Sequence, residues 1–333
     1  QSMRQHFAVM ADALTEFCPP QENPLAVDIG SNDGLLLSYL MAKGVRVMGV
    51  EPAENLATEA EARGIPTICD FLGARVAEEI LSREGQAHVI TATNVFAHVD
   101  GIDELTFYVS KLLQPDGVFV IEVPDLGEML SQGTFDLIYH EHLSYFALSP
   151  LARFFADQGM AIFRLQPVST HGGSLRIFVQ GTQGTRPVEA SVAQRLATEQ
   201  EWVGGEERYA RFAEYVEATK EEFIALIRER RSQGRRIAGY GLPAKANTLL
   251  NYYALTAEQI EYIVDDNPLK QGKWAPGSRV PVVAASRLDE DPVESIVIFP
   301  WNLADEIRAK LVEYEERGVE FLVPVQSEVL SNR

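Results

Sequence analysis

The stretch VDIGSNDG, residues 27–34, decides the fold of this 333-residue chain. A short apolar run ends at Asp28 and enters a turn that contains Gly30 and Gly34. An amphipathic stretch begins at Leu35, so the segment has the pattern of a strand, a glycine turn and a helix. Apolar β-branched runs then alternate with amphipathic stretches over residues 25–123, which predicts a parallel, doubly wound sheet.

Five strands are predicted in this part of the chain, and they are LAVDIG, VRVMGVE, IPTICD, AHVITATN and GVFVIEVP. Helices are predicted at residues 34–43, 53–63, 73–84, 102–113 and 149–158. MAIFRLQPV and GSLRIFVQ follow as two strands joined only by the turn STHG, so they must pair antiparallel. A parallel sheet that ends in an antiparallel hairpin resembles the sheet of class I methyltransferases. A dinucleotide dehydrogenase is expected to have a purely parallel sheet of six strands.

The second half of the chain has a different pattern. Residues 186–233 predict one or two long helices, whose aromatic residues at helical intervals indicate packing against a domain. From Arg235 the alternation of strand and helix resumes, which predicts a second, smaller Rossmann-like α/β domain. The expected division is a cofactor-binding domain at 1–185, a helical linker at 186–233 and a C-terminal domain at 234–333.

Composition limits the possible partners. A formal charge of −19 opposes binding to nucleic acid or to anionic membranes, and no apolar run approaches the ~20 residues of a membrane span. The only two cysteines, Cys18 and Cys69, suit a reducing, cytoplasmic location. The first residues, Gln1-Ser2-Met3, resemble the remnant of a cleaved tag, so the cloned protein is expected to begin at Met3.

The glycine turn predicts the kind of cofactor. Gly30, Asn32 and Gly34 alternate, and glycine lets the backbone approach a ligand closely. A dinucleotide turn favours G-x-G-x-x-G, because pyrophosphate needs a bare helix N-terminus. Here Asp33 would repel a pyrophosphate, whereas carboxylates such as Asp28 and Asp33 suit the ammonium group of S-adenosylmethionine.

Acids at the ends of later strands complete this prediction. Glu51 lies 23 residues after Asp28, where an acid would bind both ribose hydroxyls. Asp70 ends the next predicted strand and is expected to meet the adenine amine, with Phe71 beside the ring. Asn94 ends the fourth strand and is expected at the same edge of the sheet. The alternative is an ordinary βα turn with an acidic helix cap.

A cluster of acid–base residues follows the predicted fifth strand. FDLIYHEHLSYF, residues 135–146, places Tyr139, His140, Glu141 and His142 in an unbroken run. His98 follows the fourth strand and His171 lies in the hairpin turn. Ligands of open α/β sheets bind outside the carboxyl ends of the strands, so these groups are expected to converge on the reactive end of the cofactor. The alternatives are structural histidines and a zinc site, although the His-x-His spacing and the absence of a supporting cysteine speak against zinc.

A second glycine turn lies in the predicted C-terminal domain. GYGLPAKAN places Gly241 and Pro243 before a helix, with Lys245 and Asn247 in its first turn. A helix start with a lysine is a plausible cradle for a diphosphate or a nucleotide. The alternative is that these residues only cap and pack the helix.

Several blocks of the sequence together resemble the sugar C-methyltransferases of antibiotic deoxysugar pathways. The blocks are VDIGSNDG, GVEP, NVFAHV, FDLIYHEHLSYF, HGGSLRIF, GYGLPAKANTLLNY and VDDNPLKQGK, from about Met3 to the C-terminus. The resemblance implies S-adenosylmethionine as cofactor and a dTDP-linked 4-keto sugar as substrate, methylated on the carbon next to the ketone. This family usually starts with a zinc-binding domain of four cysteine ligands, which this sequence does not contain.

The resemblance also implies residue roles. His142 is expected to be the base, with Tyr139, Glu141 and His98 orienting the sugar or assisting proton movement. His171, Gly241, Pro243, Lys245 and Asn247 are expected to contact the substrate, whose nucleotide lies between the two halves in the family. No metal is expected.

Three other functions remain open from the sequence. One is a C-methyltransferase that acts on a different activated-methylene substrate, such as a carrier-bound ketoacid. Another is a nicotinamide-dependent sugar oxidoreductase, which Asp33 and the missing G-x-G-x-x-G oppose. The third is a non-catalytic relative, which the intact Tyr139, Glu141 and His142 oppose.

Overall fold

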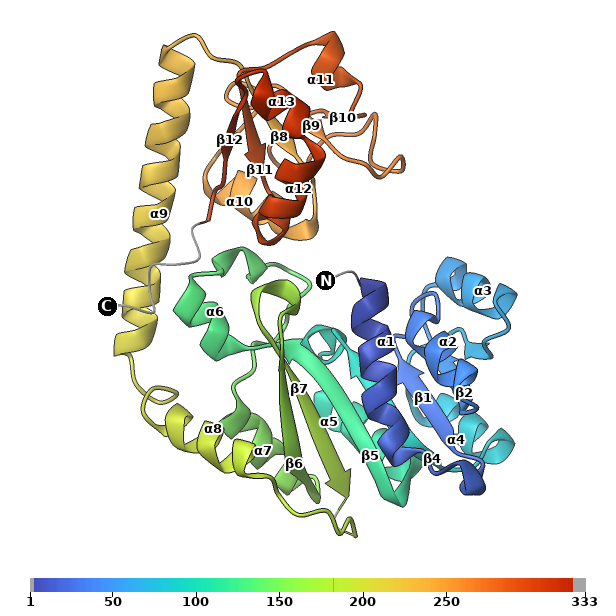
Figure 1. Cartoon of the computed structure of the whole chain (residues 1–333). Helices are drawn as coiled ribbons and strands as arrows, with labels where there is room; N and C mark the ends of the chain where they lie inside the picture. Colours follow the sequence, from blue (N-terminus) through green and yellow to red (C-terminus); the bar gives the residue numbers. More distant parts are fainter. Residues whose placement is uncertain (1–2, 182, 326–333) are drawn as a thin grey trace. The chain divides into compact units, whose positions relative to one another are not determined.

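The chain folds into two compact units, each built on one sheet (Figure 1). The computed structural model describes residues 3–181 and 183–325. The N-terminal unit consists of Gln1–Leu126 and Leu143–Gly204, and the C-terminal unit consists of Gly127–His142 and Gly205–Arg333.

The N-terminal unit contains a seven-stranded sheet with the order β3-β2-β1-β4-β5-β7-β6. The first five strands are parallel, and β7 pairs antiparallel with both β5 and β6. The predicted class I methyltransferase sheet with an antiparallel hairpin is therefore confirmed. Its strands are β1 Leu25–Ile29, β2 Arg46–Val50, β3 Thr67–Ile68, β4 Ala87–Thr93, β5 Leu113–Pro124, β6 Met160–Val168 and β7 Ser174–Gly181.

Helices cover both faces of this sheet because the strands are apolar on both sides. Ala26 of β1 packs in the cluster that contains α1 and α2, whereas Val27 packs in the cluster that contains α4, α5 and α7. The helices are α1 Met3–Leu14, α2 Leu35–Ala42, α3 Glu54–Ala62, α4 Ala74–Arg83, α5 Ile102–Leu112, α7 Leu148–Asp157 and α8 Ala190–Gln200. The sequence pattern did not predict α1, whose Met10, Ala11 and Leu14 are fully buried.

The C-terminal unit repeats this architecture on a smaller scale. Its five strands are all parallel, in the order β10-β9-β8-β11-β12. The predicted second Rossmann-like sheet is therefore present. The strands are β8 Ile237–Tyr240, β9 Ile263–Val264, β10 Val282–Val283, β11 Ser295–Ile298 and β12 Glu320–Leu322.

Helices of the C-terminal unit form two layers around its sheet. The long helix α9 and helix α10 pack with Ile237 and Ile263 on one face, and α11 and α12 pack with Ala238 and Val264 on the other. The helices are α6 Leu126–Gln132, α9 Glu207–Ser232, α10 Ala244–Tyr252, α11 Arg287–Glu290, α12 Ala304–Lys310 and α13 Val312–Glu316. Helices α12 and α13 are separated only by Leu311.

The compact units differ from the expected domain boundaries in two places. The segment Gly127–His142 belongs to the C-terminal unit, although it lies inside the range 1–185. The reason is that Phe135 packs against Tyr252 and Tyr253 of the C-terminal unit. Helix α8, expected in the linker, belongs to the N-terminal unit, because Glu199 accepts hydrogen bonds from the backbone N–H groups of Leu148 and Ser149.

Candidate functional site

The turn after β1 has the geometry of a close-approach loop. Gly30 has φ +67° and Gly34 has φ +76°, which is the left-handed region that glycine tolerates. A Cβ atom on Gly30 would lie 2.4 Å from Cγ2 of Val95, so only glycine fits there. The backbone N–H of Gly30 donates to Val50 O at 2.8 Å, which fixes the turn against the end of β2.

Glu51 organises the turn directly. Its carboxylate is 6% exposed and accepts two backbone hydrogen bonds, from Asn32 N–H and from Ala53 N–H, each at 2.9 Å. Parallel strands place their carboxyl ends at one edge, so the residue after β2 meets the turn after β1. The carboxylate therefore stands at the position expected of a ribose-binding acid, held rigidly by the backbone.

Asp28 is buried at the end of β1, and its Oδ1 accepts a hydrogen bond of 2.6 Å from the Thr91 hydroxyl. Burial raises the pKa of Asp28 to about 7, the Thr91 hydrogen bond opposes this rise, and the neighbouring charge of Glu51 adds to it. A carboxyl group in this state can ionise when a cation arrives.

Asp33 has a different environment from the one that its predicted role requires. Its Oδ2 accepts a hydrogen bond of 2.7 Å from Arg63, and its Oδ1 accepts one of 3.3 Å from Leu35 N–H at the start of α2. The carboxylate thus already pairs with an arginine, while the N-cap of α2 is Gly34, which has no side-chain cap. Its role toward an ammonium group stays a prediction.

The adenine end of the expected cofactor site lies after β3. Asp70 Oδ1 accepts from Phe71 N–H at 2.7 Å, and Oδ2 pairs with Arg75 at 2.6 Å. The Arg75 hydrogen bond, followed by that of the Phe71 N–H, lowers the pKa of Asp70. The Phe71 ring is 74% exposed at the carboxyl edge of the sheet, where a planar ligand can stack on it.

Two polar atoms at this edge have no hydrogen-bond partner among the described residues although they are buried. They are Oγ of Ser31 and Oδ1 of Asn94, which follow β1 and β4 respectively. Asn94 has φ +56° and donates its N–H to Glu122 O at 2.8 Å. Buried polar groups without partners are costly, so both atoms suit a ligand that supplies donors. His98 follows in the short helix Phe96–His98.

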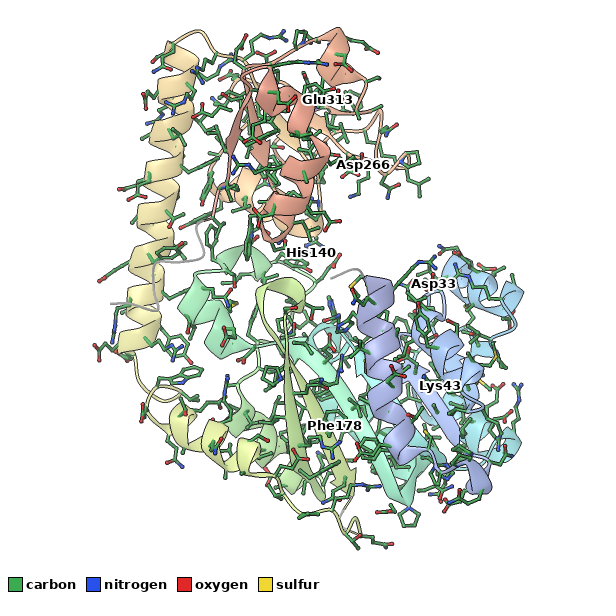
Figure 2. All side chains as sticks on the ribbon, in the orientation of Figure 1. Asp33, Lys43, His140, Phe178, Asp266 and Glu313 are labelled. Atoms are coloured by element: carbon green, nitrogen blue, oxygen red, sulfur yellow. The ribbon has the colours of Figure 1, made fainter. Side chains whose placement is uncertain are left out.

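The C-terminal unit holds His142 in a defined ring orientation. Its Nδ1 lies 2.8 Å from Leu137 O, a carbonyl that can only accept, so Nδ1 carries the hydrogen. Its Nε2 lies 3.3 Å from the Tyr139 hydroxyl, and the two rings are 4.4 Å apart. The other two members of the run, His140 and Glu141, are exposed (Figure 2).

The turn that holds His171 is the short helix Thr170–Gly172, and the His171 side chain lies outside the described part of the structure. The chain passes into the N-terminal unit directly after His142, and Leu143 N–H donates to Ala97 O at 2.9 Å. Within the N-terminal unit, Leu143 is therefore bonded to the short helix that contains His98.

Lys245 is not a free cation at the start of α10. Its side chain is 12% exposed, its Nζ lies 3.9 Å from Oδ2 of Asp136, and it bonds to Asn302. The ammonium also lies 4.4 Å from the centroid of the Trp301 ring. Burial lowers the pKa of Lys245, and the charge of Asp136 opposes this change. The carboxylate of Asp136 was not anticipated as its partner.

The turn after β8 has the same backbone arrangement as the turn after β1. Gly241 has φ +77°, its N–H donates to Val264 O at 2.7 Å, and a Cβ atom there would lie 2.5 Å from Pro300. Asp265 ends β9 as Glu51 ends β2, and it accepts from Leu242 N–H at 2.8 Å and Asn267 N–H at 2.9 Å. Sequence reasoning missed Asp265, although its place after a strand was the same signal that singled out Glu51.

A buried ionic cluster in the N-terminal unit was also missed. Glu122 of β5 is 0% exposed and receives Arg176 at 2.8 Å and His6 at 3.0 Å. Burial alone would raise the pKa of Glu122, but hydrogen bonding to His6 and the charge of Arg176 lower it. These residues come from α1, β5 and β7, so no local pattern could have connected them.

Comparison with known proteins identifies the family. Residues 3–165 match a family described as a methyltransferase domain, and residues 169–326 match the C-methyltransferase C-terminal domain. The chain is 37% identical over 325 residues to the C-methyltransferase NovU of Streptomyces niveus, which covers 97% of this chain and 77% of that protein. The chain belongs to the C-methyltransferase family.

Solved methyltransferases are similar in part. Magnesium protoporphyrin IX methyltransferase of Synechocystis PCC 6803, solved with S-adenosylhomocysteine, shares 18% identity, with a TM-score of 0.41 over 54% of this chain and 83% of that one. An S-adenosylmethionine-dependent methyltransferase of Clostridium acetobutylicum shares 14% identity, with a TM-score of 0.40 over 53% and 91%.

This C-methyltransferase uses S-adenosylmethionine as its cofactor. The chain's own residues fit that group: Glu51 is held by two backbone bonds at the position expected of a ribose-binding acid, and Phe71 is exposed beside Asp70. Gly30 keeps the approach to the backbone open. Family membership also decides against the nicotinamide-dependent oxidoreductase that the sequence left open.

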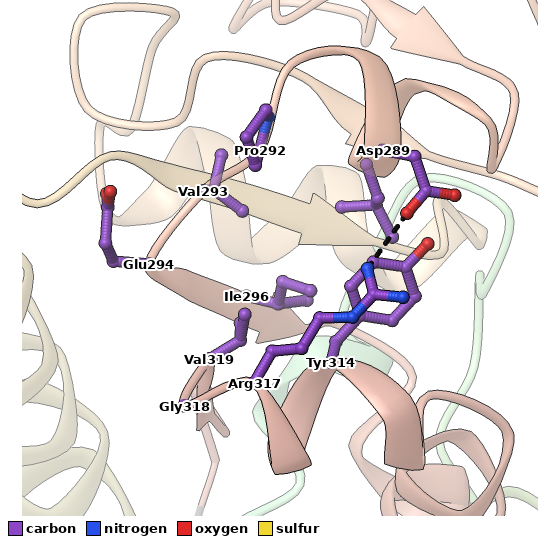
Figure 3. A pocket seen from close by; sticks show the side chains of 10 residues that line it. Asp289, Pro292, Val293, Glu294, Ile296, Tyr314, Arg317, Gly318 and Val319 are labelled. Atoms are coloured by element: carbon purple, nitrogen blue, oxygen red, sulfur yellow. Dashed lines mark hydrogen bonds and ion pairs between the residues drawn. The ribbon is translucent and has the colours of Figure 1, made fainter.

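The C-terminal unit also contains a cavity of about 370 Å³, lined by residues such as Asp289, Glu294, Tyr314 and Arg317 (Figure 3). It lies beside the residues that precede β11 and β12, at the amino ends of these strands. Ligands of open α/β sheets bind at the carboxyl ends, so this cavity is separate from the candidate site.

Within residues 3–181 and 183–325, no group of three or more His, Cys, Asp or Glu side chains is arranged to hold a metal ion. Nor does any helix of the described residues combine the length and apolar character needed to cross a membrane.

Proposed function

We propose that this C-methyltransferase acts on a nucleotide-linked 4-keto deoxysugar, with dTDP as the nucleotide, and methylates the carbon next to the ketone. His142 removes the proton from that carbon. The observation that carries this proposal is the 2.8 Å contact between His142 Nδ1 and Leu137 O, which leaves Nε2 as the proton acceptor.

The proposed reaction starts with proton transfer to Nε2 of His142. The electron pair of the broken C–H bond moves toward the ketone, whose oxygen becomes an enolate. A carbon next to a ketone is weakly acidic, so this step needs both a placed base and a donor for the oxygen. The Tyr139 hydroxyl, 3.3 Å from His142 Nε2, is positioned beside the base and can donate to the substrate oxygen.

Bound S-adenosylmethionine supplies an electrophilic methyl group on a sulfonium. Once bound, the cofactor would take the electron pair of the enolate at its methyl carbon and would leave as S-adenosylhomocysteine. Glu51, Asp70, Phe71 and Asn94 hold the cofactor in this proposal. Asp28 ionises to meet its ammonium group, because the carboxyl pKa near 7 allows a proton to be lost at neutral pH.

The nucleotide end of the substrate is assigned to the C-terminal unit. The turn at Gly241, with Pro243 and Asn247 at the start of α10, resembles the cofactor turn of the N-terminal unit in its backbone bonds. Asp265 is added to this set as the counterpart of Glu51. The Oδ1 atom of Asn247 is buried without a partner among the described residues, which suits a ligand donor.

Hydrogen exchange at the substrate carbon tests the proposal. The dTDP-linked 4-keto sugar is incubated in heavy water with the enzyme and S-adenosylhomocysteine, so that deprotonation is observed without methylation. We expect His142→Asn to bind both ligands and to lower exchange and turnover about 10²- to 10⁴-fold, the usual share of a general base.

Exchange at the unaltered rate in a folded His142→Asn variant would move the base to another residue, such as His98 or Tyr139. A matched variant is His140→Asn, which changes an exposed neighbour of the same type. Labelled methyl transfer into a panel of nucleotide-linked keto sugars, followed by product mass, then tests the substrate class. Transfer only into a non-sugar ketoacid would contradict it.

A further inference from the structure

We propose that Asp136 is a positioning residue for His142: its carboxylate fixes the turn whose carbonyl holds the imidazole, and thereby sets which ring nitrogen carries the proton. This inference rests on the proposed function in treating His142 as the base. It adds Asp136, which was not among the site residues predicted from the sequence, and it gives Lys245 a second role.

Asp136 is fully buried and has strong partners. Its Oδ2 accepts a hydrogen bond of 2.6 Å from Nε1 of Trp301 and lies 3.9 Å from the ammonium of Lys245. Lys245 is itself held against the Trp301 ring. A buried carboxylate is costly unless it is bonded and paired. Both groups meet Oδ2, whereas Oδ1 is buried without a hydrogen-bond partner among the described residues, and burial raises the pKa of Asp136.

The position of Asp136 within its turn connects these partners to the base. It is the central residue of the short helix Phe135–Leu137, closed by the hydrogen bond from Ile138 N–H to Phe135 O at 2.9 Å. The next carbonyl after Asp136 is Leu137 O, the acceptor of His142 Nδ1. Moving the Asp136 side chain therefore moves the group that sets the tautomer of His142.

Apolar packing also holds this turn, because Phe135 and Leu137 are both buried. The Phe135 ring contacts Tyr252 and Tyr253 at centroid distances of 5.6 and 6.0 Å. Aromatic contacts tolerate sliding and rotation more readily than a directed hydrogen bond does. The indole N–H of Trp301, aimed at one carboxylate oxygen, supplies the directional restraint.

The test measures the tautomer of His142 directly. The protein is labelled with ¹⁵N-histidine, and the ring nitrogen shifts of His142 are assigned by their loss in His142→Asn. We expect a protonated Nδ1 and an unprotonated Nε2 in the parent protein. In Asp136→Ala and in Trp301→Phe, we expect a mixed tautomer population.

Proton exchange at the substrate carbon is expected to fall about 10- to 100-fold in both variants, because small displacements of reacting groups are costly. Affinity for S-adenosylhomocysteine is expected to stay unchanged, since that site lies in the N-terminal unit. Asp136→Asn should preserve more of the exchange rate than Asp136→Ala, because its amide oxygen can still accept from Trp301. Asp291→Asn is the matched control, since it removes an acid of the same unit that pairs with Arg236 and Arg287.

An unaltered tautomer in a folded Trp301→Phe variant would overturn the inference. If Asp136→Ala does not fold, Trp301→Phe and Asp136→Asn decide the question. Failure of the proposed function gives a different result: the tautomer shifts in the Asp136 and Trp301 variants while proton exchange stays at the parent rate.

Discussion

Replacing Glu51 tests the cofactor site with a change that the structure makes interpretable. In Glu51→Gln the side chain keeps its size, but only one terminal atom can accept. The carboxylate now receives N–H groups from Asn32 and Ala53, each at 2.9 Å. The amide NH₂ must therefore face one of these N–H donors, and the ribose loses an ionised acceptor.

The expected magnitude follows from these contacts. A hydrogen bond to a charged group contributes about 1.5–3 kcal/mol, so loss of one such bond to the ribose weakens S-adenosylhomocysteine binding about 10- to 150-fold. The new contact between the amide NH₂ and a backbone N–H also displaces the turn after β1, which adds to the loss of S-adenosylhomocysteine affinity. Glu51→Ala is a poorer test, because it leaves two backbone donors unsatisfied and lowers stability as well.

Isothermal titration with S-adenosylhomocysteine measures the effect, and thermal unfolding of the free protein shows whether the fold is kept. Glu54→Gln is the matched control, since Glu54 is an exposed acid in the first turn of α3, three residues away. Equal affinities for Glu51→Gln and the parent would refute the assignment of Glu51 to the ribose. An equal loss of S-adenosylhomocysteine affinity in Glu54→Gln would show that only the net charge of the protein affects binding.

Lys245→Ala is expected to weaken dTDP binding without changing S-adenosylhomocysteine affinity, as measured by titration. If both affinities changed, or neither did, the proposal that the C-terminal unit binds the nucleotide and the N-terminal unit binds the cofactor would be contradicted. The raised pKa of Asp28 means that, between pH 4 and pH 7, the folded state keeps a proton that the unfolded state has released, so the stability contributed by this group falls as pH rises through that range. Asp28→Asn should therefore gain more stability relative to the parent at pH 8 than at pH 4, measured by thermal unfolding. Glu122→Gln should destabilise the N-terminal unit by about 3–5 kcal/mol in chemical denaturation, because it leaves Arg176 buried without its carboxylate. The control Asp116→Asn, which alters the exposed pair with Arg186, should change stability by at most about 1 kcal/mol.

Local patterns were sufficient to predict most of the fold. The strands and helices from Leu25 to Gly181 follow the alternation of apolar and amphipathic stretches, since backbone geometry imposes periods of two and about 3.6 residues. The antiparallel hairpin followed from the short connection between β6 and β7. Helix α1 was missed, although its buried Met10 and Leu14 pack on the sheet face that also receives α2.

The candidate cofactor residues could be found in the sequence because chain order fixes where they lie. In a parallel sheet every carboxyl end reaches the same edge, so Gly30, Glu51, Asp70 and Asn94 are neighbours by topology alone. The partner of Asp33 was not predictable, since Arg63 lies on the next helix and its direction depends on helix packing. The same limit applied to Lys245 and Asp136, which are 109 positions apart in the sequence.

The sequence by itself determined the two α/β halves, the glycine turns and the acid at the end of β2, because each depends on residues close together in the chain. Only the tertiary structure decided which unit carries Tyr139 and His142, since the packing of Phe135 on Tyr252 and Tyr253 overrides their place between β5 and β6. It also decided the ring orientation of His142 and the burial of Asp136 and Glu122. These properties depend on side chains brought together from distant segments, and no spacing along the chain encodes such contacts.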